Sequence, residues 1–280
     1  MAVSRPGGIV TVFRPMSTLD RYLGLLGQPP TPPTLESLTA LVRAQLGRVP
    51  FENISKLLLK KRGATFIPSL DEHLDGIERH NFGGTCYANN PHFFSLLEHL
   101  GYAVTLCGAS MSKPDVHIVS IVRLHGCEYL IDVGYAAPFF EPLPRDRGHE
   151  VHFGTCTYHF EPRDDRGRSR LTMTRAGQRV HGYLVDPTPR PLSHFREVIE
   201  DSYRSHATFM NAVVTERFRP GGSVRIHNLT VTETDGDRVT RSTLADRDEL
   251  VVAIEKHAGM PAALVREAID GVSLEGDIYT

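Results

Sequence analysis

Cys86, His117 and Asp132 have the residue types, and the order along the chain, of a nucleophilic triad. In such a triad a thiolate attacks a carbonyl carbon, a histidine handles the proton, and a carboxylate orients the imidazole ring. The three side chains can work together only if the fold brings them to one place. The segments around them indicate how it could do so.

Cys86 lies in the segment FGGTCYANNP, residues 82–91, and is one of four cysteines in 280 residues. Gly83 and Gly84 permit a tight turn and a close approach of substrate to the backbone. The chain then enters a helical segment, so the thiol would lie near a helix N-terminus, where the helix dipole favours an anion. A buried core position is the alternative for any single cysteine, but the other three lack this glycine-rich approach.

The segment VHIVSIVRLHGCEYLIDVGY, residues 116–135, predicts a β-hairpin. His125 and Gly126 suit a two-residue turn with positive φ angles. With this turn Arg123 faces Glu128, an opposite-charge pair that supports the register. The same register continues to the expected pairs Val119–Asp132 and His117–Gly134.

In this register His117 and Asp132 lie on the same sheet face as diagonal neighbours. Diagonal positions are about 7–8 Å apart, a gap that polar side chains can bridge. Asp132 could then accept a hydrogen bond from one imidazole nitrogen and leave the other nitrogen for Cys86. The alternative is two solvated polar residues, but an unpaired aspartate among the apolar residues of YLIDVGY would be costly to bury.

The elements that would position this site change along the chain, and three domains are expected: 1–101, 102–190 and 191–280. The first is mainly helical, with one helix from the cap Thr34 to a stop at Gly47 and another from Asn90 to Gly101. The second is rich in β-branched and aromatic residues and predicts an antiparallel sheet or barrel. The third mixes a helix over LSHFREVIEDSYRS, several strands and a closing helix, so the fold class is α+β.

Composition is that of an ordinary globular protein, with 40% apolar residues, 23% charged residues and a formal net charge of −2. This charge gives no general attraction to nucleic acid or to a membrane surface, and neither is an expected partner. The apolar runs fall short of the ~20 residues of a membrane span, and the first residues show no signal-peptide pattern. No CxxC or HExxH motif is present, so we expect no metal and a cytoplasmic setting with free thiols.

Several segments resemble the arylamine N-acetyltransferases over nearly the whole chain. They are RVPFENIS, GGTCYANN, DVHIVSIV, YLIDVGYAAPFFEPL and ATFMNAVVTER. The resemblance implies a helical bundle, a central β-barrel and an α/β lid, with a papain-like triad of Cys86, His117 and Asp132. It also implies a ping-pong reaction: Cys86 takes an acetyl group from acetyl-CoA and passes it to an arylamine, a hydrazine or an N-hydroxyarylamine.

The resemblance further implies an aromatic substrate pocket that contains Phe51, Tyr135 and Phe209. Gly134 offers flexible backbone beside the site and is a candidate contact for the CoA co-substrate. The chain also departs from the family pattern. Phe82 stands where the family usually has arginine, and Ala88 where it often has glutamate.

Three other functions share these residues and stay open. One is a related amide synthase that takes a carrier-bound acyl thioester, because some family relatives release polyketide chains in this way. Another is a cysteine protease or transglutaminase-like hydrolase, which also uses a Cys-His-Asp triad. The third is a non-catalytic binding module on the same scaffold, which the altered FGG segment permits. The oligomeric state and the physiological amine are not encoded in any recognisable motif.

Overall fold

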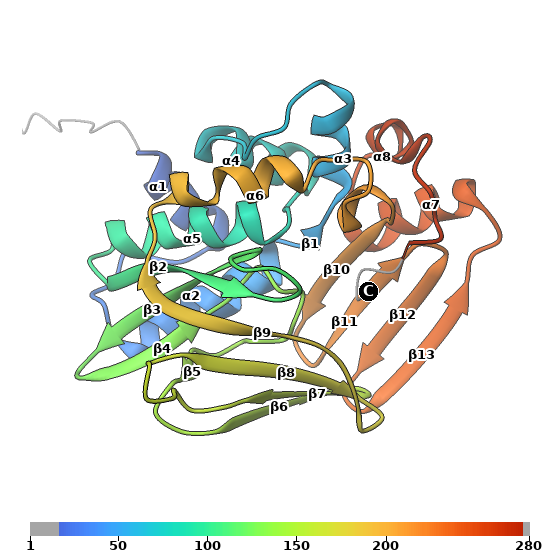
Figure 1. Ribbon diagram of the computed structural model, residues 1–280. Helices are drawn as coiled ribbons and strands as arrows, with labels where there is room; N and C mark the ends of the chain where they lie inside the picture. The colour runs from blue at the N-terminus through green and yellow to red at the C-terminus, as the bar shows by residue number, and fades with distance from the viewer. Residues whose placement is uncertain (1–16, 277–280) are drawn as a thin grey trace, which may run out of the picture.

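The computed structural model describes residues 17–276 and confirms the α+β class. Five helices fill the first part of the described chain; most of them lie above the large sheet in Figure 1, and the second lies behind its strands. Their bounds are α1 Thr18–Leu26, α2 Leu35–Arg48, α3 Ile54–Lys61, α4 Leu70–His80 and α5 Cys86–His99. Over residues 17–276 no helix has the length and apolar character needed to cross a bilayer.

Two helix boundaries differ from the sequence prediction. The cap Thr34 is confirmed, because its side chain accepts a hydrogen bond from the backbone of Ser37, but α2 continues through Gly47 to Arg48. Helix α5 begins at Cys86 and not at Asn90, and it contains Pro91. The carbonyl of Thr85 accepts from the second and third amides that follow Cys86, so the first turn forms before the proline. Pro91 has no amide N–H and so removes one hydrogen-bond donor from the helix, but α5 continues past it to His99.

The central part of the chain forms an eight-stranded antiparallel sheet that nearly closes into a barrel (Figure 1). The strand order is β5-β4-β3-β2-β9-β8-β7-β6. The bounds are β2 Ala103–Ser110, β3 His117–Leu124, β4 Cys127–Ile131, β5 Leu143–Pro144, β6 His149–Phe153, β7 Cys156–Phe160, β8 Ser169–Arg175 and β9 Gln178–Pro189.

The β3–β4 hairpin has the predicted turn and register near its tip. His125 and Gly126 both have positive φ, and Arg123 pairs with Glu128. The ladder ends at the pair Ser120–Ile131, so the expected pairs further along do not form. The chain leaves the ladder there because side chains bind its next amides: Val133 N donates to Asn90 and Gly134 N to Asp132.

The last part of the chain contributes a second antiparallel sheet, at the right of Figure 1, with the order β1-β10-β11-β12-β13. Its edge strand β1, Phe51–Glu52, comes from the helical part, so the first and third parts share this sheet. Its other strands are β10 Val214–Arg219, β11 Gly222–His227, β12 Thr230–Asp235 and β13 Arg238–Thr243, and the helices α7 Arg247–Ala258 and α8 Ala262–Ile269 follow them. The division into three domains stays a prediction.

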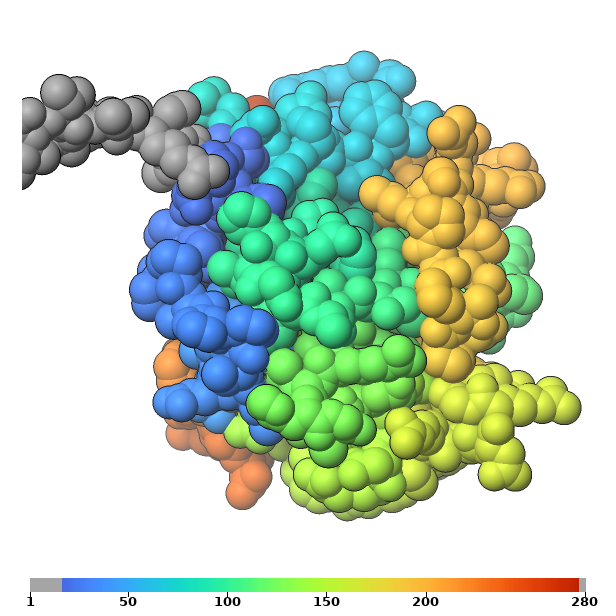
Figure 2. Space-filling view, turned by 90° about the vertical axis from the view of Figure 1, so that its left-hand side faces the viewer, coloured from blue at the N-terminus to red at the C-terminus, as the bar shows by residue number. Residues whose placement is uncertain are grey.

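The segment after the barrel is less helical than its sequence suggested. It forms a 3₁₀ turn, Leu192–Phe195, followed by the six-residue helix α6, Arg196–Asp201. Figure 2 shows this gold segment along one side of the molecule, beside the teal and green residues of α5 and the barrel. Its apolar side chains Phe195, Ile199 and Tyr203 pack in one buried cluster with Cys86 and Tyr87. The segment therefore covers the start of α5.

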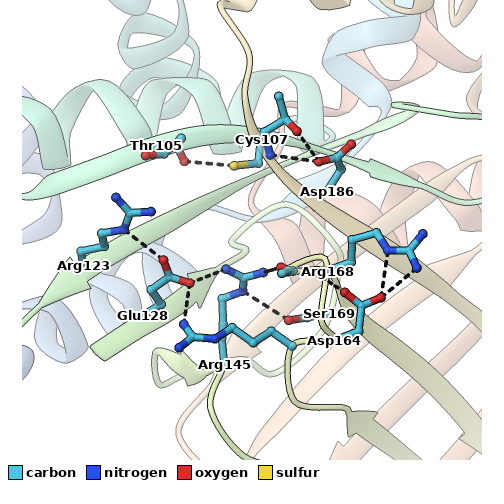
Figure 3. A network of polar contacts seen from close by, with 12 residues as sticks. Thr105, Cys107, Arg123, Glu128, Arg145, Asp164, Arg168, Ser169 and Asp186 are labelled. Atoms are coloured by element: carbon cyan, nitrogen blue, oxygen red, sulfur yellow. Dashed lines mark hydrogen bonds and ion pairs between the residues drawn. The ribbon is translucent and has the colours of Figure 1, made fainter. Parts of the chain in front are cut away.

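A buried arginine joins the hairpin to the far side of the barrel (Figure 3). The Arg145 guanidinium donates to Glu128 on β4 at 2.7 Å and to the hydroxyl of Ser169 on β8 at 3.3 Å. Glu128 also pairs with Arg123 and Arg163, both at 3.0 Å. Burial opposes ionisation of Glu128, but the surrounding guanidinium groups lower its pKa below the ordinary value. The network therefore ties β4 to β8 across the barrel.

Candidate active site

The start of α5 places Cys86 in the interior of the molecule. Gly83 must be a glycine, because a Cβ there would lie 1.9 Å from the carbonyl oxygen of Pro50. The next glycine, Gly84, accepts a hydrogen bond from the backbone of Glu52 at 3.1 Å. The glycine pair therefore packs the nucleophile segment tightly against the strand β1. The sequence analysis explained the glycines by substrate access to the backbone. The structure gives a different reason, which is close backbone packing.

His117 and Asp132 form a buried, hydrogen-bonded pair. His117 Nε2 lies 2.7 Å from Asp132 Oδ2, and the two residues are 2% and 3% exposed. The pairing expected from the hairpin face is present even though the ladder ends before these residues. Cys86 lies close enough to His117 for its side chain to raise the pKa of the imidazole. Since Nε2 is taken by Asp132, the ring presents Nδ1 to the thiol.

The charges of this pair are coupled. Burial disfavours the imidazolium, but the negative charges of Asp132 and Cys86 outweigh it and raise the pKa of His117 above its ordinary value. Burial also disfavours the Asp132 carboxylate, yet His117 and the other hydrogen-bond donors lower the pKa of Asp132. The site is therefore built to hold an imidazolium beside a carboxylate, the arrangement that stabilises a thiolate on the other side of the ring.

Two further side chains hold Asp132, and the sequence analysis did not identify either. Asn90 Nδ2 donates to Asp132 Oδ1 at 2.9 Å and to the Ile118 carbonyl at 2.6 Å. The Tyr183 hydroxyl donates to Asp132 Oδ2 at 2.9 Å. Asn90 could have been found, because it lies in the resemblance segment GGTCYANN, one helical turn after Cys86. Nothing in the sequence around Tyr183 marks it.

Gly134 lies against the nucleophile. A Cβ at this position would be 2.6 Å from Cys86 Cα and 2.7 Å from Asn90 Nδ2. The loop that follows Asp132 can thus approach α5 only with a glycine here. Close packing is therefore sufficient to explain why residue 134 is a glycine. The suggested contact of Gly134 with CoA stays a prediction.

The three aromatic candidates fall into two groups around the triad. Tyr135 faces the imidazole of His117 edge-on at 5.6 Å between ring centroids, and its hydroxyl lies 2.7 Å from His181 Nδ1. Phe51 and Phe209 meet at 5.7 Å between centroids and cluster with Ala136, the residue after Tyr135. The fold therefore brings all three near the loop that follows Asp132.

The departures at positions 82 and 88 leave Glu52 without an ion-pair partner among residues 17–276. Glu52 is fully buried and accepts from Gly83 N at 3.0 Å, from Ser55 N at 2.9 Å and from the Ser55 hydroxyl at 2.5 Å. Burial raises its pKa above the ordinary value despite these bonds. Backbone and hydroxyl donors are thus the groups that hold this carboxylate.

A cleft of about 320 Å³ lies between the barrel and the second sheet. It begins at Ala136 and reaches β11–β13. Arg175, Arg225 and Arg241 line it, and Arg225 is also paired with Glu216 at 2.8 Å. No sequence motif indicated this cleft. Among residues 17–276 no group of three or more His, Cys, Asp and Glu residues could hold a metal ion.

Comparison with known proteins agrees with this geometry. Residues 34–263 match the model of a family described as N-acetyltransferase. The chain belongs to the arylamine N-acetyltransferase family.

The structural neighbours share the whole fold. A solved arylamine N-acetyltransferase of Mycobacterium abscessus matches with a TM-score of 0.76 at 20% identity, over 90% of this chain and 94% of that one. The Mycobacterium marinum enzyme, solved in complex with CoA, matches with a TM-score of 0.77 at 21% identity, over 91% and 99% of the two chains.

Sequence relatives differ in how far they align. An arylamine N-acetyltransferase of Gallus gallus, the pineal gland isozyme, is 34% identical over 115 residues, 38% of each chain. The chain therefore aligns with less than half the length of this acetyltransferase. The proansamycin X synthase of Amycolatopsis mediterranei is 26% identical over 238 residues, 79% of this chain and 89% of that protein.

Proposed function

We propose that this protein transfers an acetyl group from acetyl-CoA to the nitrogen of an arylamine, a hydrazine or an N-hydroxyarylamine. The observation that carries the proposal is the buried His117–Asp132 hydrogen bond beside Cys86, whose side chain acts on the pKa of the same imidazole. Membership of the arylamine N-acetyltransferase family supports the same donor and acceptor classes.

In the first half-reaction the Cys86 thiolate attacks the thioester carbonyl of acetyl-CoA. The new bond joins Sγ to the carbonyl carbon, and the bond from that carbon to the CoA sulfur breaks. Backbone amides at the start of α5 would stabilise the oxyanion. His117 gives its proton to the departing CoA thiolate, while Asp132 keeps the ring in orientation.

In the second half-reaction the amine attacks the acetyl-cysteine. His117, now neutral, takes the proton that the amine nitrogen loses, and the Cys86 thiolate leaves. Phe51, Tyr135 and Phe209 would contact the aromatic body of the acceptor, and Gly134 would lie beside the thioester. We do not expect the transfer to the acceptor to require a metal or a second protein.

The cleft that begins at Ala136 supports the binding of a CoA thioester. It lies next to the aromatic residues of the site and carries three arginines, which suit the phosphates of CoA. The four cysteines are all unpaired, which fits the proposed reducing cytoplasmic setting.

Steady-state kinetics test the proposed function. With acetyl-CoA and an arylamine varied together, we expect parallel double-reciprocal lines, the pattern of a ping-pong reaction. The Cys86→Ser variant should lose turnover while keeping the fold. Intersecting lines, or full activity in Cys86→Ser, would contradict the mechanism.

One observation favours a second candidate, an amide synthase that takes a carrier-bound acyl thioester. The alignment with proansamycin X synthase covers 89% of that protein, whereas the aligned Gallus gallus acetyltransferase is covered over 38%. Both functions use the same cysteine chemistry, so the acyl donor separates them. Acylation of Cys86 by carrier-bound acyl thioesters, with none from acetyl-CoA, would identify the synthase.

A further inference from the structure

A second cavity, of about 300 Å³, lies between α3, α4, the segment 82–85 and the region of α6. Its size is at the lower end of the range for small-molecule sites. None of the three triad residues lines it. Phe66 lines it and is 55% exposed, so the cavity reaches the surface beside this residue.

The cavity contains a buried ammonium group. Lys56 on α3 is 5% exposed, and its Nζ donates to the Ser202 hydroxyl at 2.5 Å. The same nitrogen lies 4.4 Å from the centroid of the Tyr203 ring and 5.2 Å from that of the Tyr87 ring. No carboxylate of residues 17–276 forms an ion pair with it. Burial lowers the pKa of Lys56 to about 8, and a negative charge at Cys86 opposes this shift.

A second buried polar atom on the wall has no partner within the described part of the chain. His73 on α4 is 3% exposed, and its Nε2 makes no hydrogen bond. Burial lowers the pKa of His73 well below its ordinary value, so the ring is neutral and can offer one donor or one acceptor. An unpaired buried group of this kind costs free energy unless a ligand or a water completes it.

Phe82 and Ala88, the two departures from the family pattern, both line this cavity. The Phe82 ring and the Ala88 methyl group give this part of the wall an apolar surface.

The other charged groups of the wall are engaged with partners of their own. Arg62 pairs with Glu267 at 3.2 Å, and Asp75 pairs with Arg79 at 3.3 Å and with Arg21 at 2.7 Å. The Glu72 carboxylate accepts from the backbone of Ser69 at 2.8 Å. Lys56 is the buried cation of the wall that has no carboxylate partner among residues 17–276. The apolar part of the wall includes Leu58, Leu59, Ile67, Phe82 and Ile199.

We propose that this cavity is a second binding site, which takes a small organic carboxylate with an apolar body. The carboxylate would pair with Lys56, a polar group on the body would meet His73 Nε2, and the body would fill the apolar wall. The site is distinct from the triad, because no triad residue lines it, although a charge at Cys86 acts on Lys56.

Calorimetric titration near neutral pH tests the proposal, with 3-(4-hydroxyphenyl)propionate and its uncharged analogue 3-(4-hydroxyphenyl)propionamide as probes. Protein with Cys86 blocked by iodoacetamide should bind the carboxylate as well as untreated protein does. The carboxamide should bind about tenfold more weakly, because it cannot form the ion pair. Lys56→Met keeps the packing of the side-chain stem, and it should weaken the carboxylate about tenfold and leave the carboxamide unchanged.

Lys60→Met is the matched control on the same helix, because Lys60 is exposed and does not line the cavity. It should bind the carboxylate like the unaltered protein. Three outcomes would overturn the proposal: equal binding of the two probes, no carboxylate binding at all, or binding that Lys56→Met leaves intact. Loss of Cys86 acylation in Lys56→Met, in a protein that binds neither probe, would assign this cation to the nucleophile instead.

Discussion

Asp132 is the most tightly held side chain of the site, with hydrogen bonds from His117, Asn90, Tyr183 and the backbone of Gly134. Asp132→Asn keeps its size but removes the charge that stabilises the imidazolium. We expect turnover to fall about 10³–10⁴-fold, as for the corresponding change in other triads. The measurement is kcat with acetyl-CoA and an arylamine.

The control for this prediction is Tyr183→Phe, which removes one of the four donors and leaves the charge in place. It should reduce kcat about tenfold or less. An Asp132→Asn protein as active as Tyr183→Phe would show that the carboxylate charge does not support catalysis.

Lys56 gives a pH-dependent prediction. Burial lowers its pKa in the folded state from 10.5 to about 8, so the charged amine is more stable in the unfolded chain. The resulting cost is fully present below about pH 8 and is relieved as pH rises toward the unfolded value. At roughly 1.4 kcal/mol per unit it amounts to about 3 kcal/mol. Without ligand, Lys56→Met should therefore be more stable than the original protein near neutral pH.

Urea unfolding at several pH values measures this effect. The advantage of Lys56→Met should shrink as pH approaches the unfolded value, because the amine then becomes neutral in both states. Lys60→Met should show no such dependence, since Lys60 is exposed. An advantage that is constant with pH would mean that packing, and not charge, separates the two proteins.

At the scale of elements, the contact between α5 and the loop after Asp132 is the one that assembles the site. Gly134→Ala would place a methyl group 2.6 Å from Cys86 Cα, so the loop and the helix must separate. We expect about 1–3 kcal/mol of lost stability and a large loss of Cys86 acylation. Thermal unfolding and acylation rate are the two measurements.

Gly148→Ala is the matched control, because a Cβ there would meet its nearest atom at 3.8 Å. It should change neither stability nor acylation. If Gly134→Ala behaved in the same way, close packing of this loop would not be needed for the site.

The sequence predicts the hairpin better than the helix that bears the nucleophile. His125-Gly126 and the pair Arg123–Glu128 are local signals, and the structure confirms both. The start of α5 was misplaced because Asn90-Pro91 looks like a helix start, whereas the Asn90 side chain instead reaches Asp132. That use of Asn90 depends on a strand about forty residues away, which no local pattern reveals.

At the scale of the whole molecule, the buried Arg145 network joins the hairpin to the other half of the barrel (Figure 3). Arg145→Met would leave Glu128 with only its more exposed partners and would lose the contacts to β8. We expect about 2–4 kcal/mol of lost stability with little change in kcat, because the network does not touch the triad. Denaturant unfolding and kinetics on the same preparation check this.

Arg123→Met is the control for the network, because Arg123 pairs with the same carboxylate but is 71% exposed in its side chain. Arg123→Met should lower the free energy of unfolding by less than about 1 kcal/mol. Equal losses of stability in Arg145→Met and Arg123→Met would show that burial of Arg145 adds nothing to the stability of the barrel.

The order of helices, barrel and second sheet could be predicted because each stretch has its own residue pattern. Features formed between stretches could not. The strand β1 completes the sheet of the last part from within the helical part, and the two cavities form where elements distant in sequence meet. Local periodicity contains no information on such contacts.

The mass of the intact protein shows whether Cys86 accepts an acetyl group from acetyl-CoA, the step on which the proposed function depends. Protein mixed with acetyl-CoA and no amine should gain a single acetyl group, which Cys86→Ala should not gain and which an added arylamine should remove. An unmodified protein, or an adduct that persists in Cys86→Ala, would contradict the account.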